Sequence, residues 1–173
     1  LINQINAGPF VKTELSPGQA GSVSVYDTGN PVTAPNNRGF ATSYDNFQFA
    51  TSGKVTSLTW VGGYDYPTAG LNPNFQIAFY NDAAGVPGSQ IGSTQFVGTA
   101  FETPTAVANY FSYSAELSTP VTVATPNQYW VSIVAETDYL ANGWGWAFSS
   151  IGDKTSVQRL ENPALPQVSG FYD

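Results

Sequence analysis

The chain contains no cysteine, histidine or methionine, and only 10% of its 173 residues are charged. Globular proteins average about 25% charged residues. Without Cys and His, a protein cannot form a disulfide, a zinc finger, a haem or iron–sulfur site, a thiol nucleophile or a Ser-His-Asp relay. The composition is poorly suited to catalysis, so we expect a protein that is not an enzyme and requires no cofactor.

Positive charge is also scarce: five Lys and Arg stand against twelve Asp and Glu, for a net charge of −7. Nucleic acids and anionic lipids need basic counter-charge, so we expect no nucleic-acid partner. The longest uncharged stretches, Ala83–Phe101 and Leu117–Ala135, are interrupted by Pro and polar residues. Neither contains the roughly 20 consecutive apolar residues that span a bilayer, so no membrane span is predicted.

The sequence begins at Leu1 and is rich in Ser, Thr, Asn and Gly. A chain that lacks Met and has no basic-then-apolar start is typical of a processed, mature product. We therefore expect an extracellular or cell-surface location, with stability that comes from packing rather than from disulfides.

Apolar and polar residues alternate with a period of two in many short segments, and 12 Pro and 17 Gly leave little room for long helices. Regular short strands between Gly, Pro and Asn turns indicate a β-sandwich or barrel. We predict an all-β fold, a single antiparallel, jelly-roll-like β-sandwich of about ten strands. The chain length fits one domain over residues 1–173, with residues 1–20 and 163–173 as terminal extensions.

Several short motifs follow one another between residues 40 and 150: Asp45–Phe49, Leu58–Tyr64, Phe75–Asp82, Tyr113–Leu117, Tyr129–Ile133 and Trp144–Trp146. In this order they resemble the jelly-roll-type β-sandwich domains of bacterial secreted and surface-sorted proteins, which often carry a PEP-CTERM sorting segment. The 173 residues include no such segment. The resemblance implies a fold and a location more than an activity.

Paired carboxylates are the one acid–base chemistry that this composition allows. Glycoside hydrolysis needs two carboxyl groups about 5–10 Å apart. The candidates are Glu102, Glu116, Glu136 and Glu161, and no two of them form a close pair on one strand face. We interpret them mainly as solvated surface acids, and Glu116 in particular as an outward side chain near a strand end. A hydrolase stays a minor alternative.

Oxygen ligands for a hard cation occur in two places, at Asp27 and Asn30 and at Asp82. Calcium prefers several such oxygens from loops, and neighbouring Gly supplies flexibility. The spacing does not match an EF-hand loop. Asn81–Asp82 before Ala-Ala-Gly also fits a plain hairpin turn, so calcium is an optional ligand in this interpretation.

Aromatic residues in loops suit the stacking of sugar rings. Tyr64 and Tyr66 fall in the expected Gly62–Pro73 loop, and Tyr139 falls in another, so these three are the candidate ligand-binding residues. Trp60, Trp144 and Trp146 alternate in phase with other apolar residues and are expected in the core. Trp130 faces away from its apolar neighbours, and either covers a second layer or is exposed. The alternative to a structural or adhesive protein is therefore a lectin-like carbohydrate-binding module, with an extracellular polysaccharide as partner and calcium as an optional aid.

The two ends of the chain are mixtures of apolar and polar residues with little charge. An extension of this kind is either a loose tail or a strand that pairs with the sheet edge of a neighbouring subunit. Thr119–Ala135 also carries no charge, so it is either internal to a sheet or an edge that something covers. We therefore expect copies of the chain to assemble into a surface filament. The assembly candidates are Leu1, Ile2, Ile5, Phe10 and Val11.

Overall fold

The computed structural model describes residues 2–5, 22–27, 40–64, 72–98, 100, 102–137, 143–147, 156–160 and 169–172. These residues form thirteen strands and no helix, in two sheets packed face to face, which confirms the predicted all-β sandwich. The described part of the chain contains no helix long and apolar enough to cross a membrane.

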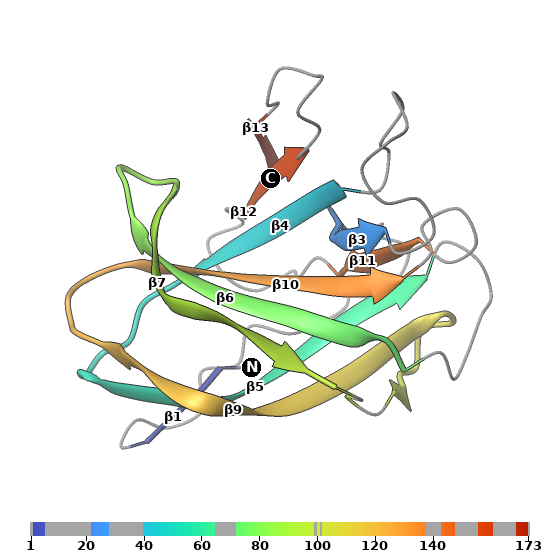
Figure 1. Cartoon of the computed structure of the whole chain (residues 1–173), viewed down its shortest axis with the longest axis horizontal. Helices are drawn as coiled ribbons and strands as arrows, with labels where there is room; N and C mark the ends of the chain where they lie inside the picture. The colour runs from blue at the N-terminus through green and yellow to red at the C-terminus, as the bar shows by residue number, and fades with distance from the viewer. Residues whose placement is uncertain are drawn as a thin grey trace.

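One sheet has six strands in the order β2-β11-β5-β9-β8, with β1 added to β5. The other sheet has seven strands in the order β13-β12-β4-β3-β10-β6-β7. Figure 1 shows β4, β10 and β6 crossing above β5 and β9. The six-stranded sheet consists of β1 (Ile2–Ile5), β2 (Ser22–Val23), β5 (Gly53–Tyr64), β8 (Thr103–Pro104), β9 (Tyr110–Val123) and β11 (Trp144–Trp146). The seven-stranded sheet consists of β3 (Val25–Asp27), β4 (Phe40–Phe47), β6 (Asn74–Asp82), β7 (Pro87–Val97), β10 (Tyr129–Thr137), β12 (Ser156–Leu160) and β13 (Ser169–Tyr172).

Nearly all strand pairs are antiparallel, as predicted, and the exception is the parallel pair of β3 with β10. Some strands extend into segments that the sequence pattern assigned to loops. β5 continues to Tyr64, inside the expected Gly62–Pro73 loop. At the predicted Asn81–Asp82 hairpin turn, β6 runs to Asp82 and β7 begins at Pro87, so the connection between them has four residues.

Interlocked aromatic rings fill the space between the sheets. Trp60 stacks on Tyr113, with ring centroids 5.5 Å apart, and Phe75 forms a T-shaped pair with each of them, with ring centroids 5.0 Å apart. Trp144 meets both Phe75 and Tyr113. All four side chains are at most 1% exposed. Aromatic pairs in such geometry contribute about 0.5–1.5 kcal/mol each beyond the burial of their area.

A second, smaller apolar cluster lies on the outer face of the seven-stranded sheet. Trp130 is fully buried there with Tyr44 and Val157, and Tyr80 packs against them. Arg159 covers the cluster, with its guanidinium 5.2 Å from the centre of the Tyr44 ring. Of the two alternatives for Trp130, the structure shows the second layer.

The uncharged segment Thr119–Ala135 is predicted to be either internal to a sheet or a covered edge. One half of the segment fits each description. Its second half is β10, which is internal to the sheet because β6 pairs along one side and β3 and β4 along the other. Its first half ends β9 near the sheet edge, where the side chain of Gln95 donates to the Thr119 carbonyl at 2.8 Å and accepts from the Thr119 N–H at 3.0 Å. The Gln95 amide therefore covers this edge as a partner strand would.

We predict that Gly62→Ala destabilises the sandwich. A β-carbon at Gly62 would overlap the buried Trp144 ring and lie 2.8 Å from the Gly145 carbonyl oxygen. Overpacking of this kind costs about 1–3 kcal/mol. In Gly98→Ala, the new β-carbon would have Asn74 Oδ1 as its nearest neighbour at 3.7 Å. Urea denaturation should show a clear loss of unfolding free energy for Gly62→Ala only; equal effects of the two substitutions would contradict the packing argument.

Candidate functional site

One end of the sandwich is closed by a hydrogen-bonded group around Glu102. Its carboxylate accepts hydrogen bonds from the hydroxyls of Tyr64 and Tyr113, the latter at 3.1 Å. The Tyr113 oxygen in turn accepts from Trp144 Nε1 at 3.3 Å. The Glu102 backbone N–H donates to Asn72 Oδ1 at 3.0 Å, which fixes the segment that carries the carboxylate. Glu102 therefore satisfies the polar ends of core aromatic residues.

This arrangement corrects the interpretation of Tyr64 as an exposed loop aromatic. Tyr64 ends β5 and is 5% exposed, and its ring packs edge-on against Phe111 at 5.9 Å. The Gly62-Gly63 pair before it suggested a loop. In the structure, both glycines lie in the strand because their bare surfaces receive the rings of Trp144 and Tyr110. The Tyr64 ring is thus unavailable for stacking on a sugar.

Asp82 is engaged within the protein. Its Oδ1 accepts hydrogen bonds from Trp130 Nε1 at 2.8 Å and from Gln128 Nε2 at 3.3 Å, and both carboxylate oxygens accept from the Gly85 N–H. Asp82 thus closes the hairpin turn and anchors the buried Trp130 indole. The hairpin interpretation of Asn81–Asp82 fits these contacts better than a metal ligand does.

The other loop candidates gain no geometric support. Asp27 is the last residue of β3, whereas Asn30, Tyr66 and Tyr139 lie outside the described residues. Within the described ranges, no group of three or more Asp and Glu side chains is placed to hold a metal ion. Sugar stacking by Tyr66 and Tyr139 stays a prediction.

The N-terminal strand β1 adds to an edge of the six-stranded sheet. Antiparallel pairing places Ile2 opposite Leu58, Asn3 opposite Ser57 and Ile5 opposite Lys54. The neighbouring β11 pairs only with residues 62–64 of β5, and β1 pairs with residues 54–58 on the same edge. Two of the assembly candidates, Ile2 and Ile5, therefore belong to β1, which pairs with β5 of the same chain. Leu1, Phe10 and Val11 are outside the described residues.

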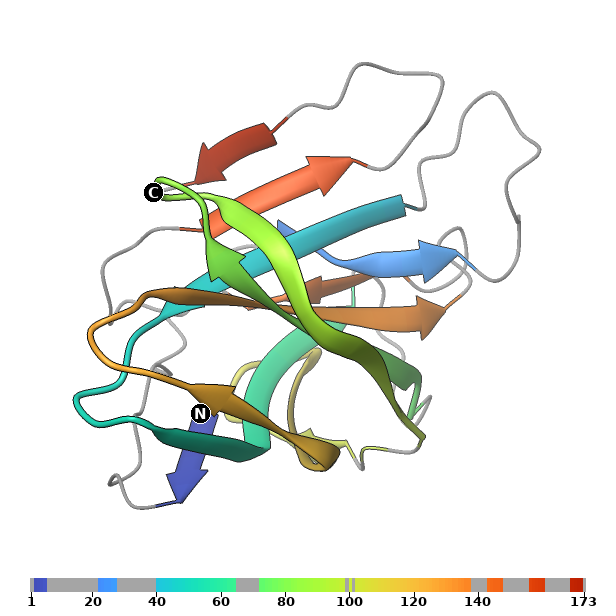
Figure 2. The same ribbon diagram turned by 60° about the vertical axis from the view of Figure 1, so that its left-hand side comes forward.

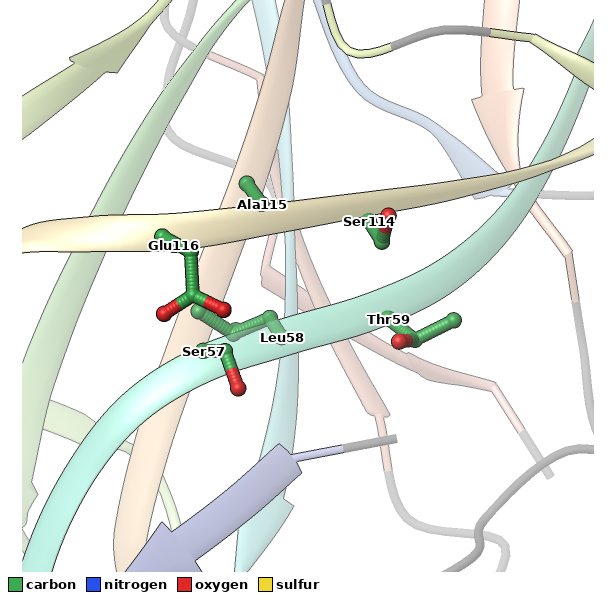
Figure 3. A pocket seen from close by; sticks show the side chains of 6 residues that line it. All are labelled: Ser57, Leu58, Thr59, Ser114, Ala115 and Glu116. Carbon is green, nitrogen blue, oxygen red and sulfur yellow. The ribbon is translucent and has the colours of Figure 1, made fainter.

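A polar hollow of about 210 Å³ lies on the outer face of β5 and β9. Its lining includes the side chains of Ser57, Thr59, Ser114 and Glu116 (Figure 3). Glu116 is exposed, as predicted, and it stands opposite Ser57 across the two strands. The sequence does not reveal the hollow, because its hydroxyl residues come from two distant segments. The strand register is needed to show that these residues lie opposite one another. Thr59 and Ser114 are such a pair.

We predict that the unfolding free energy falls in alkaline solution because Tyr64 and Tyr113, which donate hydrogen bonds to Glu102, then lose their protons when the chain unfolds. Burial, and for Tyr64 also the hydrogen bond to Glu102, raises the pKa of Tyr64 and Tyr113 above the ordinary tyrosine value of about 10. The folded state therefore keeps these protons where the unfolded state loses them, so the unfolding free energy decreases as pH rises above about 10. Tyr64→Phe removes one of these protons. It should cost about 1–3 kcal/mol near pH 7 and make the alkaline loss shallower.

The measurement is urea denaturation between pH 7 and pH 11. Tyr80→Phe serves as the control because it removes a phenol hydroxyl from the outer face of the other sheet. An alkaline slope for Tyr64→Phe as steep as that of the parent chain would contradict the role of this group.

Comparison of the chain with protein-family models, with curated proteins and with solved structures finds no match.

Proposed function

We propose that this chain is an extracellular structural protein that assembles with its own copies by exchange of β1. The observation that carries the proposal is the position of β1 on the open part of the β5 edge. A strand that pairs with its own sheet edge can form the same backbone hydrogen bonds with the same edge of another copy. Exchange therefore needs no new contact.

The attachment of β1 is short, which favours exchange. β1 has four residues, and its register shifts between Asn3 and Gln4, so the ladder with β5 is interrupted. Elements held by few backbone bonds open locally at low cost. Sixteen residues, 6–21, separate β1 from β2. Because an extended chain spans at most about 3.3–3.6 Å per residue, this connection can reach about 50 Å, far enough to reach a neighbouring molecule.

The rest of the described molecule supports a structural role rather than chemistry. Of the four candidate glutamates, Glu102 holds two core tyrosines and Glu136 accepts from Gln76 at 2.9 Å. Arg159 donates to the Pro87 carbonyl oxygen at 2.7 Å and so joins β12 to the hairpin of β6 and β7. Figure 2 shows this hairpin reaching toward β12. These charged groups act within the fold.

Disulfide trapping tests the exchange, and the absence of native cysteine makes single-cysteine variants unambiguous. Two differently tagged chains, Asn3→Cys and Ser57→Cys, are mixed at high concentration and oxidised. Directly opposed strand residues lie within disulfide range, so exchange should yield a mixed disulfide dimer. Asn3→Cys mixed with Thr122→Cys is the matched control, since Thr122 lies on β9 opposite Lys54.

The double variant with both Asn3→Cys and Ser57→Cys gives the complementary result. When oxidised within one chain it locks β1 in place, so the β1-dependent oligomers should disappear, and reduction should restore them. A yield of mixed dimer no greater than in the Thr122→Cys control, with the locked and reduced forms of equal size, would refute the exchange.

The polar hollow favours a second candidate function, binding of a saccharide. Three hydroxyls and one carboxylate converge there in a space of about 210 Å³, which suits a polyol that donates and accepts hydrogen bonds. The carboxylate of Glu116 would accept bonds from sugar hydroxyls, and charge-assisted bonds of this kind are stronger than neutral ones. This binding would accompany, rather than replace, assembly.

Binding to a glycan array of neutral hexose polymers tests this second function. Glu116→Ala should lower the affinity for any polymer bound by the parent chain about tenfold, since a hydrogen bond to a charged group contributes about 1.5–3 kcal/mol. Thr122→Ala, on the same strand outside the hollow, should leave it unchanged. The absence of binding, or equal affinity of Glu116→Ala and the parent chain, would exclude the hollow.

A further inference from the structure

β7 forms one edge of the seven-stranded sheet, because β6 is the one described strand that pairs with it there. It lies within Ala83–Phe101, a stretch of nineteen residues without a charged side chain. Soluble proteins usually protect an edge strand with charged side chains, above all Lys. This edge has none.

The outward side chains of β7 are small and polar apart from one. Phe96 is 69% exposed and is the one large hydrophobic side chain that the described residues expose. It pairs with Gln76 across β6 and thus faces out from the sheet, whereas its neighbour Gln95 points inward to β9. Ser89, Gln90, Gly92 and Ser93 are also exposed. We call these four residues and Phe96 the β7 patch.

A bulge protects this edge only in part. The pairing with β6 skips from Ile91 to Gln95, and Gly92 between them has a φ of 66°. A bulge bends the strand and blocks continuous addition of another strand. The two hydrogen bonds between the Gln95 side chain and the Thr119 backbone hold the last part of β7 against the sandwich, so Phe96 projects from a fixed backbone. Contact at this edge therefore depends on Phe96 and short backbone segments.

We infer that the β7 patch is a contact between two copies of this chain. Each copy carries a net charge of −7, so association is least opposed where two uncharged surfaces meet. Edge backbone groups and an exposed Phe are self-complementary, as a contact around a two-fold axis requires. A patch of five residues is small for a stable dimer, and the contact is therefore weak by itself.

This inference deepens the proposed function. It rests on that function only for the formation of a filament, which needs the β1 contact as well as the β7 contact. A two-fold contact alone closes into a dimer. A chain that makes a second, different contact through β1 links these dimers in an open series. The β7 contact itself does not require exchange.

Sedimentation equilibrium of the full chain tests the contact separately from the β1 exchange. The oxidised Asn3→Cys, Ser57→Cys chain, with β1 locked, serves as the starting protein. It should form a weak dimer at high concentration. Adding Phe96→Asp should raise its dimer dissociation constant at least tenfold, because two carboxylates would face each other in the contact. Thr122→Asp, an exposed position on β9 of the other sheet, should leave it unchanged.

Circular dichroism and urea denaturation establish that all three proteins remain folded. A locked chain that stays monomeric at millimolar concentration, or a Phe96→Asp constant equal to that of Thr122→Asp, would overturn the inference. Neither result bears on the mixed disulfide between Asn3→Cys and Ser57→Cys chains. Conversely, absence of that disulfide with an intact β7 dimer would refute the exchange and leave the β7 contact in place.

Discussion

The rings between the two sheets impose the constraint on which the rest of the structure depends. Tyr113 stacks on Trp60 and meets Phe75 and Trp144, so strands of both sheets are held by one set of contacts. A buried Tyr hydroxyl needs a hydrogen-bond partner. Glu102 accepts hydrogen bonds from the hydroxyls of Tyr64 and Tyr113 at one end of the sandwich. The Glu102 carboxylate thus links Tyr64 of β5 and Tyr113 of β9 at that end.

That packing determines where function can be placed. Of the candidate ligand-binding aromatics, Tyr64 is inside, and two carboxylates are engaged by the fold: Glu102 with tyrosines and Asp82 with Trp130. Within the described part of the chain, the accessible groups include backbone at the sheet edges, small polar side chains on the outer faces, Glu116 and Phe96. Such surfaces suit association by strand pairing and weak recognition of polyols better than they suit acid–base catalysis.

Alternation of apolar and polar residues was sufficient to predict the sandwich, because Phe75, Ile77 and Phe79 lie on one face of β6 as their spacing indicates. The same pattern failed where a local turn signal is overruled by packing against a residue far away in the sequence. Gly62-Gly63 signals a loop until the Trp144 ring, 82 positions away, is known to pack on it. The edge position of β7 depends on strand order, which no local pattern contains. The absence of charge is visible in the sequence of β7 as it is in Thr119–Ala135, but composition does not show which of the two segments forms an edge.

The low charge of this chain matters most at the edge strands of its two sheets. An acidic protein keeps copies apart by repulsion, and charges on its edge strands would add local protection. Here net repulsion acts at long range, while β7 has no charge and β1 is a short, interrupted strand. Salt screens the long-range term within about 10 Å at 0.1 M, but it leaves backbone hydrogen bonds and the exposed Phe96 ring in place. Association controlled in this way would depend on ionic strength and local concentration, which fits the proposed assembly of chains after secretion.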